Sequence, residues 1–102
     1  NPAIDGVASN IAAYKERSSA YTLQEEDRTL NCTANTFAVS LPDALAFENR
    51  IFAVKNTGAG VITLDTSDGV QLIDGNLTET INPGDCVTVQ STSSAWIIIS
   101  RA

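Results

Sequence analysis

The sequence contains no histidine, and this absence removes several kinds of catalytic site. Histidine is the commonest general base near neutral pH and the commonest metal-ligating side chain. A serine triad or a cysteine–histidine dyad therefore cannot be built from this chain. Two cysteines without histidine also disfavour a structural zinc site within one chain. We predict that the protein is not an enzyme and needs no cofactor or metal.

Positive charge is scarce: six lysines and arginines stand against twelve aspartates and glutamates, a formal net charge of −6. The basic residues form no cluster, whereas nucleic acids and anionic membrane surfaces are bound by concentrated Lys and Arg. No apolar run approaches the ~20 residues that span a bilayer. We therefore expect neither nucleic acid nor membrane among the partners.

Methionine is absent and cysteine is rare. Without an initiator methionine, we expect that the first residue is missing, or that the chain is processed or excised from a longer one. Cys32 and Cys86 allow at most one internal bridge. Both lie in strand-like sequence, so two interpretations stay open: small strand residues, or a disulfide that joins an early strand to a late one.

Short alternating runs separated by turn residues fill the chain from Tyr21 onward. Residues 50–65 are typical, because hydrophobic alternation leads into a glycine-rich turn at 56–60 and then into β-rich sequence again. This stretch predicts a β-hairpin, and residues 70–75 predict a third strand. Eight or nine such strands predict an all-β domain over residues 20–102, an antiparallel sandwich or barrel of jelly-roll type. Because the connections are short, we expect strands next in sequence to pair antiparallel.

The run before Pro42 predicts a set of buried side chains, because alternate residues of a strand share one face. This set is Phe37, Val39 and Leu41. After Pro42, residues 43–48 predict one helical turn, or a packed loop with Leu45 and Phe47 as its anchors.

Trp96 lies between alanine and three isoleucines, which favours a core or intersubunit position over stacking on a sugar. Four aspartates could in principle supply the carboxylate pair of a glycoside hydrolase, or a calcium site. All four, Asp65, Asp68, Asp74 and Asp85, lie in or beside expected turns, where aspartate is favoured for local hydrogen bonding. We interpret them as turn-forming residues.

Residues 1–19 differ from the rest of the chain. Ile4, Val7, Ile11 and Tyr14 are spaced three, four and three apart, as on the seam of a helix. We expect an N-terminal arm that is extended or partly helical, or a short helical segment, before the β-domain. Such an arm has too little apolar surface to fold alone, so a neighbouring chain would order it. These four side chains are the candidates for partner binding.

Several motifs follow one another in order along the β-domain. They are Tyr21-Thr22-Leu23 with Asp27, Leu41-Pro42-Asp43-Ala44, residues 50–58, residues 61–65, Asp68-Gly69, Leu72-Ile73-Asp74-Gly75, Pro83-Gly84-Asp85, Val87-Thr88-Val89, and Trp96 before the isoleucines. In this order and spacing they resemble a small β-domain of tailed-bacteriophage virion proteins, which recurs in tail fibres, head fibres and capsid-decorating proteins. The resemblance covers about four-fifths of the chain. It implies a non-enzymatic, usually homotrimeric virion component with no catalytic or metal site.

The expectation that results is a homotrimeric capsid-decorating, or cement, protein, located in the virion and assembled in the cytoplasm of the bacterial host. Its partners would be further copies of itself and the major capsid protein, which the N-terminal arm would contact. The alternative is a receptor-binding module of a head or tail fibre that recognises a host-surface glycan or protein. A glycan hydrolase or lyase is the least favoured hypothesis.

Overall fold

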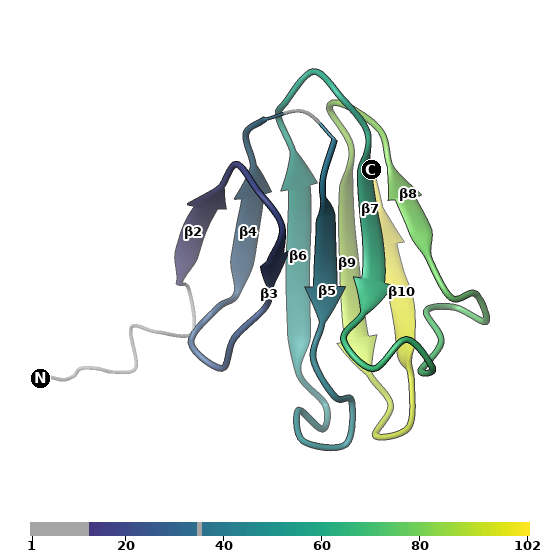
Figure 1. Ribbon diagram of the computed structural model, residues 1–102. Coiled ribbons are helices and arrows are strands. Elements are labelled where there is room, and N and C mark those ends of the chain that lie inside the picture. The colour runs from purple at the N-terminus through teal and green to yellow at the C-terminus, as the bar shows by residue number, and fades with distance from the viewer. Residues whose placement is uncertain (1–12, 35) are drawn as a thin grey trace, which may run out of the picture.

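The computed structural model describes residues 13–34 and 36–102, and Figure 1 labels its strands. These strands are β2 (Tyr14–Arg17), β3 (Tyr21–Thr22), β4 (Thr29–Cys32), β5 (Ala38–Leu41), β6 (Ile51–Asn56), β7 (Ile62–Thr66), β8 (Glu79–Ile81), β9 (Cys86–Ser91) and β10 (Trp96–Arg101). Within the described residues, every regular element is a strand, which confirms the predicted all-β class.

The strands form two sheets that pack as a sandwich (Figure 1). The five-stranded sheet has the order β10-β9-β6-β4-β2, and the four-stranded sheet has the order β3-β5-β7-β8. From β2 to β7 the chain changes sheet at every connection, so consecutive strands never pair. Only the turns that join β7 to β8 and β9 to β10 link neighbours within one sheet.

The predicted antiparallel, jelly-roll-like arrangement is wrong, because the sheets are mixed. The pairs β2–β4, β3–β5, β4–β6 and β5–β7 are parallel, whereas β6–β9, β7–β8 and β9–β10 are antiparallel. Parallel neighbours need a long crossover. Here the strand in the opposite sheet belongs to that crossover, as β5 does between β4 and β6. Short connections can therefore coexist with parallel pairing.

The predicted hairpin at residues 50–65 is wrong for the same reason, because β6 and β7 lie in different sheets. The turn between them crosses the sandwich and is held by the buried side chain of Asn56. Its Nδ2 donates to the carbonyl oxygens of Gly60 at 2.8 Å and Ile81 at 2.9 Å, and its Oδ1 accepts from the Gly58 amide at 3.0 Å. Gly58 has no room for a side chain, because a Cβ there would lie 2.3 Å from the carbonyl oxygen of Ala34.

The core lies between the sheets and follows the predicted alternation. Val39 and Leu41 are fully buried, and Phe37 packs partly buried against the same cluster. Trp96 is fully buried, which confirms its core position; its Nε1 donates to the Pro42 carbonyl oxygen at 3.1 Å. Such a bond satisfies the indole N–H inside an apolar environment.

The cysteines are free thiols and form no bridge. Cys32 points into the core from β4, whereas Cys86 is half-buried on the other side of the same sheet, on β9. Two side chains on opposite faces of a sheet cannot bond covalently without breaking its strands. The first interpretation, small strand residues, is confirmed.

One local prediction is wrong, and another is confirmed only in part. Residues 70–75 form an irregular loop rather than a strand, with only isolated bridges at Ile73, which pairs with Asn76 and Trp96. In the turn after Pro42, Phe47 packs against the core as predicted and its amide donates to the Asp43 carbonyl oxygen at 3.2 Å, whereas Leu45 is 66% exposed and Ala44 is buried instead. The sequence pattern marked both segments as apolar but did not show which side chains face the core.

Candidate interaction surfaces

Strand β2 forms one edge of the five-stranded sheet and runs parallel to β4. Its residues alternate between the two sides of the sheet. Tyr14 and Glu16 are exposed on the outside, whereas Lys15 and Arg17 are half-buried. The helical interpretation of Tyr14 is therefore wrong, because Tyr14 lies in a strand. Two charged side chains point inward at this edge of the sandwich, whereas most inward side chains of the other strands are apolar.

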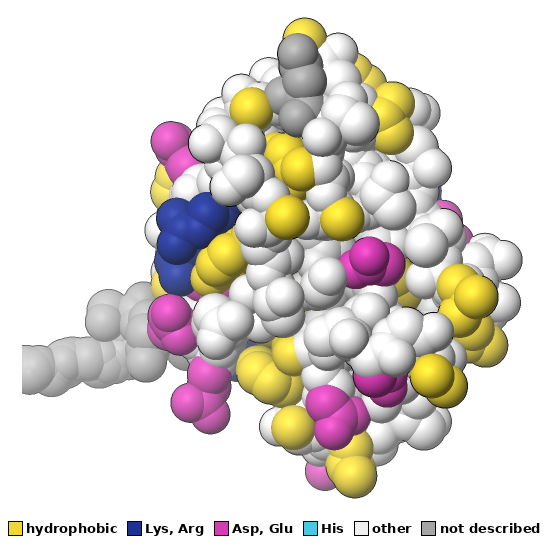
Figure 2. All heavy atoms as spheres, viewed as in Figure 1, with side chains coloured by type: hydrophobic (Ala, Val, Ile, Leu, Met, Phe, Trp, Pro, Cys, Tyr) yellow, Lys and Arg dark blue, Asp and Glu magenta, His cyan; other side chains and the backbone are white. Residues whose placement is uncertain are grey.

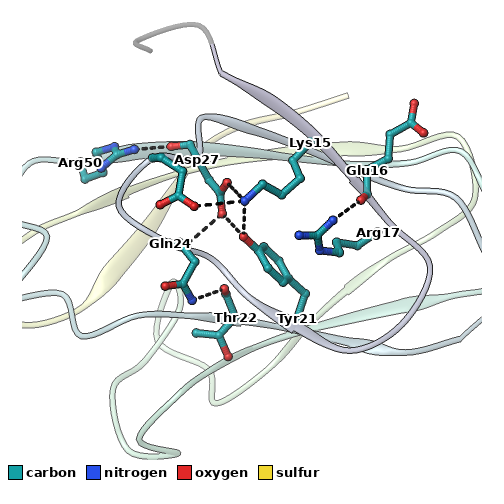
Figure 3. A network of polar contacts seen from close by, with 9 residues as sticks. Lys15, Glu16, Arg17, Tyr21, Thr22, Gln24, Asp27 and Arg50 are labelled. Atoms are coloured by element: carbon teal, nitrogen blue, oxygen red, sulfur yellow. Dashed lines mark hydrogen bonds and ion pairs between the residues drawn. The ribbon is translucent and has the colours of Figure 1, made fainter.

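Lys15, Tyr21 and Asp27 form a polar group between β2 and β3 that we call the anchor cluster (Figure 3). The Lys15 ammonium lies 2.9 Å from Asp27 Oδ1 and donates to the Tyr21 hydroxyl at 2.9 Å. The Tyr21 hydroxyl donates to Asp27 Oδ2 at 2.5 Å, and the Gln24 amide donates to the same oxygen at 2.8 Å. Asp27 is 1% exposed, so its charge is compensated almost entirely by these groups.

The pKa values in the anchor cluster reflect this arrangement. Burial alone would raise the pKa of Asp27, but hydrogen bonds from Tyr21, the Gln24 amide and Lys15 outweigh burial and hold that pKa below its usual range. Hydrogen bonds to Tyr21 and Asp27 raise the pKa of Lys15 well above its usual value. Burial and the bond to Asp27 raise the pKa of Tyr21. Near neutral pH the cluster therefore contains an ammonium, a neutral phenol and a carboxylate.

Two arginines complete the surroundings of the anchor cluster. Arg17 lies over the Tyr21 ring, with 4.6 Å between its guanidinium carbon and the ring centroid, which is cation–π geometry. Arg50 donates to the Asp27 carbonyl oxygen, and its guanidinium lies 4.8 Å from the Phe52 ring centroid. The loop between β3 and β4 is thus bound to β2, β3 and the start of β6.

We call the outer side of the five-stranded sheet the central face. The outward residues are Tyr14, Glu16, Thr29, Asn31, Ile51, Ala53, Lys55, Cys86, Thr88, Gln90, Ile97 and Ser100. Most of them are uncharged and of small or medium size. At the β2 side, Asn31 Nδ2 donates to the Tyr14 hydroxyl at 2.9 Å, and that hydroxyl donates to Glu16 at 2.8 Å. Tyr14, one of the predicted binding residues, is therefore fixed against the sheet while 57% of it stays exposed.

The outer side of the four-stranded sheet consists mainly of short polar side chains. Its outward residues are Thr22, Ala38, Ser40, Thr63, Asp65 and Thr80. Ser40 Oγ donates to Asp65 Oδ1 at 2.6 Å. Figure 2 shows this side of the molecule, and most of the visible surface there is neither hydrophobic nor charged.

One end of the sandwich, which we call the loop end, is formed by residues 23–28, 42–50, 67–78 and 92–95. Because β2, β4 and β6 are parallel, β2 also begins at this end. The exposed apolar side chains there are Leu45, Val70, Leu72 and Leu77. The exposed carboxylates there are Glu25, Glu26, Asp43, Glu48, Asp68 and Asp74. Carboxylates and hydrophobic groups are interspersed at the lower end of Figure 2.

Three of the four predicted turn-forming aspartates lie in or beside turns, and one of these, Asp68, makes local hydrogen bonds. Asp68 Oδ1 accepts from the amides of Val70 and Gln71 at 2.9 and 3.0 Å, which lowers the pKa of Asp68. Asp74 adopts a positive φ of 53°, as turn aspartates can. Asp85 immediately precedes β9, and Asp65 lies within β7 rather than in a turn.

Residues 13–34 and 36–102 hold no group of three or more His, Cys, Asp or Glu side chains placed to bind a metal ion. In the same residues, no helix is long and apolar enough to cross a membrane. The predicted binding residues Ile4, Val7 and Ile11 lie outside the described residues. Neither family models, nor curated proteins, nor solved structures gave a match to this chain.

Proposed function

We propose that this chain is a non-enzymatic structural protein of a bacteriophage virion, a homotrimeric capsid-decorating protein that bridges and stabilises neighbouring shell subunits. The order of its sequence motifs supports this proposal, and a small all-β sandwich is compatible with it. The partners are the major capsid protein and two further copies of the chain. The site of action is the virion, assembled in the host cytoplasm.

The anchor cluster is the observation that carries the proposal. Among the described strands, β2 is an edge strand of only four residues, and so short a strand would fray if only its backbone held it. Here Lys15 binds the buried carboxylate of Asp27 at 2.9 Å, so β2 is joined to the domain by side chains as well. Residues 1–12 therefore connect to a rigid attachment point. A segment bound to a shell at Ile4, Val7 and Ile11 would transmit force directly into the sandwich.

The loop end has features that suit a contact between this end of the sandwich and a shell. Gln71 connects its two long loops, because its Nε2 donates to Asp43 at 2.8 Å and its Oε1 accepts from the Ala44 amide at 2.9 Å. Leu45 and Val70, which are 66% and 73% exposed, flank this connection. Exposed apolar side chains that are held in place suit a protein contact. They lie at the end of the sandwich where residues 1–12 join β2.

The mechanism is mechanical. Each copy contributes a small contact area on the shell, and a homotrimer repeats that contact three times about one axis. Once one arm is bound, the next two bind at a high effective concentration, so weak individual contacts add up to tight binding. Because decoration binds the assembled shell and not its separated subunits, it stabilises the shell by mass action.

The test is cosedimentation of the full chain with empty shells of the phage that encodes it. Deleting residues 1–19 would remove β2 as well, so a truncated chain would not test the arm alone. We therefore use the full chain with Ile4, Val7 and Ile11 replaced by serine. If these side chains are half-buried on the shell, they contribute about 4 kcal/mol together, so the affinity should fall about 1000-fold.

The matched control replaces Ala3, Ala8 and Ala12 by serine, which alters the same segment but removes little apolar surface. This control should bind like the wild type. If neither the wild type nor the control cosediments with shells, the capsid-decorating role is wrong. Binding of the same protein to intact host cells would then support the alternative, a receptor-binding module of a phage fibre.

A further inference from the structure

Among the described strands, those at the edges of the two sheets carry features that oppose pairing with another strand. Edge strand β2 has Lys15 and Arg17 pointing inward, and inward charges hinder the docking of a further strand. Edge strand β10 is interrupted by a bulge between Ile98 and Ser100. The other two edges, β3 and β8, are two and three residues long. A second copy of this chain would therefore meet a face of the sandwich rather than extend a sheet.

The middle of the central face carries small side chains. Its central strand, β6, presents Ala53, which lies between Thr29 of β4 and Thr88 of β9. Ile51 and Ile97 lie in the next row, on either side of Gln90. Small side chains at the centre allow another protein surface to approach the backbone closely, and the isoleucines supply apolar area.

Charge identifies the partner that fits this face. The chain has a net charge of −6, so two copies repel at most orientations. The loop end presents exposed carboxylates, and the outer side of the four-stranded sheet presents Asp65 without a basic residue. The central face carries one acid, Glu16, and one base, Lys55, and is therefore neutral. Copies of this acidic chain can meet there without bringing like charges together.

Glu16 and Lys55 are also placed so that each can meet the opposite charge on another copy of the chain. Glu16, Asn31 and Lys55 occupy one cross-strand row, with Glu16 at the edge and Lys55 on the central strand. Tyr14 and Ala53 occupy the same two strands one row away. A symmetry axis parallel to the strands preserves height along them, so the rows of one copy meet the same rows of another. Glu16 can then approach Lys55, and the large Tyr14 side chain can cover the small Ala53.

We propose that the central face is the surface through which copies of this chain associate. This inference rests on the proposed homotrimer for the number of copies, but the identity of the face can be tested without a shell. In the assembly, each copy turns its five-stranded sheet toward the axis. The outer side of the four-stranded sheet stays in solvent.

The first test measures molar mass by sedimentation equilibrium for the full chain and for two variants in which one alanine is replaced by lysine. Ala53→Lys places a long cation at the centre of the central face. Ala38→Lys is the matched control, because Ala38 is also half-buried and outward-facing but lies on β5, in the other sheet. We expect the wild type and Ala38→Lys to have the same oligomeric mass. Ala53→Lys should be monomeric, with a dissociation constant at least 100-fold higher.

The second test uses charge exchange and also guards against misfolding. Glu16→Lys places its new cation near Lys55 of a neighbouring copy and should weaken association about 10-fold. Glu16→Lys combined with Lys55→Glu restores opposite charges and should recover most of the wild-type mass. A purely structural defect in the single variant would not be repaired by the second change. Near-UV circular dichroism of Trp96 verifies the fold of each variant.

The outcomes separate this inference from the proposed function. A monomeric wild type at ~100 times the concentration used for shell binding overturns the inference. Dissociation by Ala38→Lys but not by Ala53→Lys overturns it as well. A dimer that Ala53→Lys dissociates supports the face and refutes the homotrimer. Trimers that Ala53→Lys dissociates but that do not bind shells support the face and refute capsid decoration.

Discussion

Replacing Asp27 with asparagine removes one negative charge from the anchor cluster with almost no change in size. The carboxylate accepts from the Tyr21 hydroxyl and the Gln24 amide and lies 2.9 Å from the Lys15 ammonium. Breaking a buried ion pair costs about 3–5 kcal/mol when the remaining charge stays buried. The Lys15 side chain is 25% exposed, so water can partly solvate its ammonium. We therefore expect Asp27→Asn to lower the free energy of unfolding by about 2–3 kcal/mol near pH 7.

The assay is urea unfolding followed by the fluorescence of Trp96, at one fixed protein concentration because association adds to apparent stability. A loss of this size corresponds to a fall in melting temperature of about 10–15 °C for a chain of this length. The matched control is Asp65→Asn, in which a half-buried carboxylate loses its charge beside Ser40. That variant should cost less than about 1 kcal/mol.

The pH dependence provides the sharper test. The pKa of Asp27 is lower in the folded protein than in the unfolded chain, so its contribution is complete above the unfolded value of about 4. The contribution is lost as the pH falls through the folded pKa. The difference between wild type and Asp27→Asn should therefore shrink below about pH 4. A deficit that is the same near neutral pH and in acid, or no deficit near neutral pH, would refute the reasoning.

Two further predictions concern the turn before β7 and the thiols. Gly58→Ala should cost about 3 kcal/mol in urea unfolding, because its Cβ would lie 2.3 Å from the Ala34 carbonyl oxygen. Gly69→Ala meets no atom within 4 Å and should lose only the ~1 kcal/mol of an unfavourable positive φ; equal losses would contradict the steric argument. Burial raises the pKa of Cys32 to about 11, so a thiol reagent near pH 8 should modify only Cys86 in the native protein and both residues in denaturant. Rapid native modification of Cys32 would show that the core opens.

Alternation predicted the strands and the core because both depend on neighbours in sequence. Val39, Leu41 and Trp96 are buried as their patterns indicate. Which strands become neighbours depends on how the chain crosses between sheets, and the turn residues look the same in a hairpin and in a crossing. For that reason the sequence of residues 56–60 predicts a hairpin turn. In the structure the turn crosses between the sheets, and Asn56 binds the carbonyl oxygen of Ile81, far away in sequence.

The surfaces were less predictable than the fold. Strand β2 has the inward residues Lys15 and Arg17 where a strand pattern requires apolar ones, so its four residues carry no alternating hydrophobic signal. The partner for Lys15, Asp27, is part of a run of three acids that reads as an exposed turn. Only the folded chain shows that the last acid of that run is buried. The role of Tyr14 in partner binding stays a prediction.

The parallel course of the first strands determines where the two ends of the domain lie. Strand β10 runs antiparallel to β9, and β9 runs antiparallel to β6, so β10 has the same direction as β6 and β2. The described chain therefore begins beside β2 at the loop end and reaches Ala102 at the opposite end (Figure 1). There the Ala102 backbone exchanges hydrogen bonds with Cys86 at 2.7 and 2.9 Å. A peptide fused after Ala102 would therefore leave the sandwich at the end opposite the loop end.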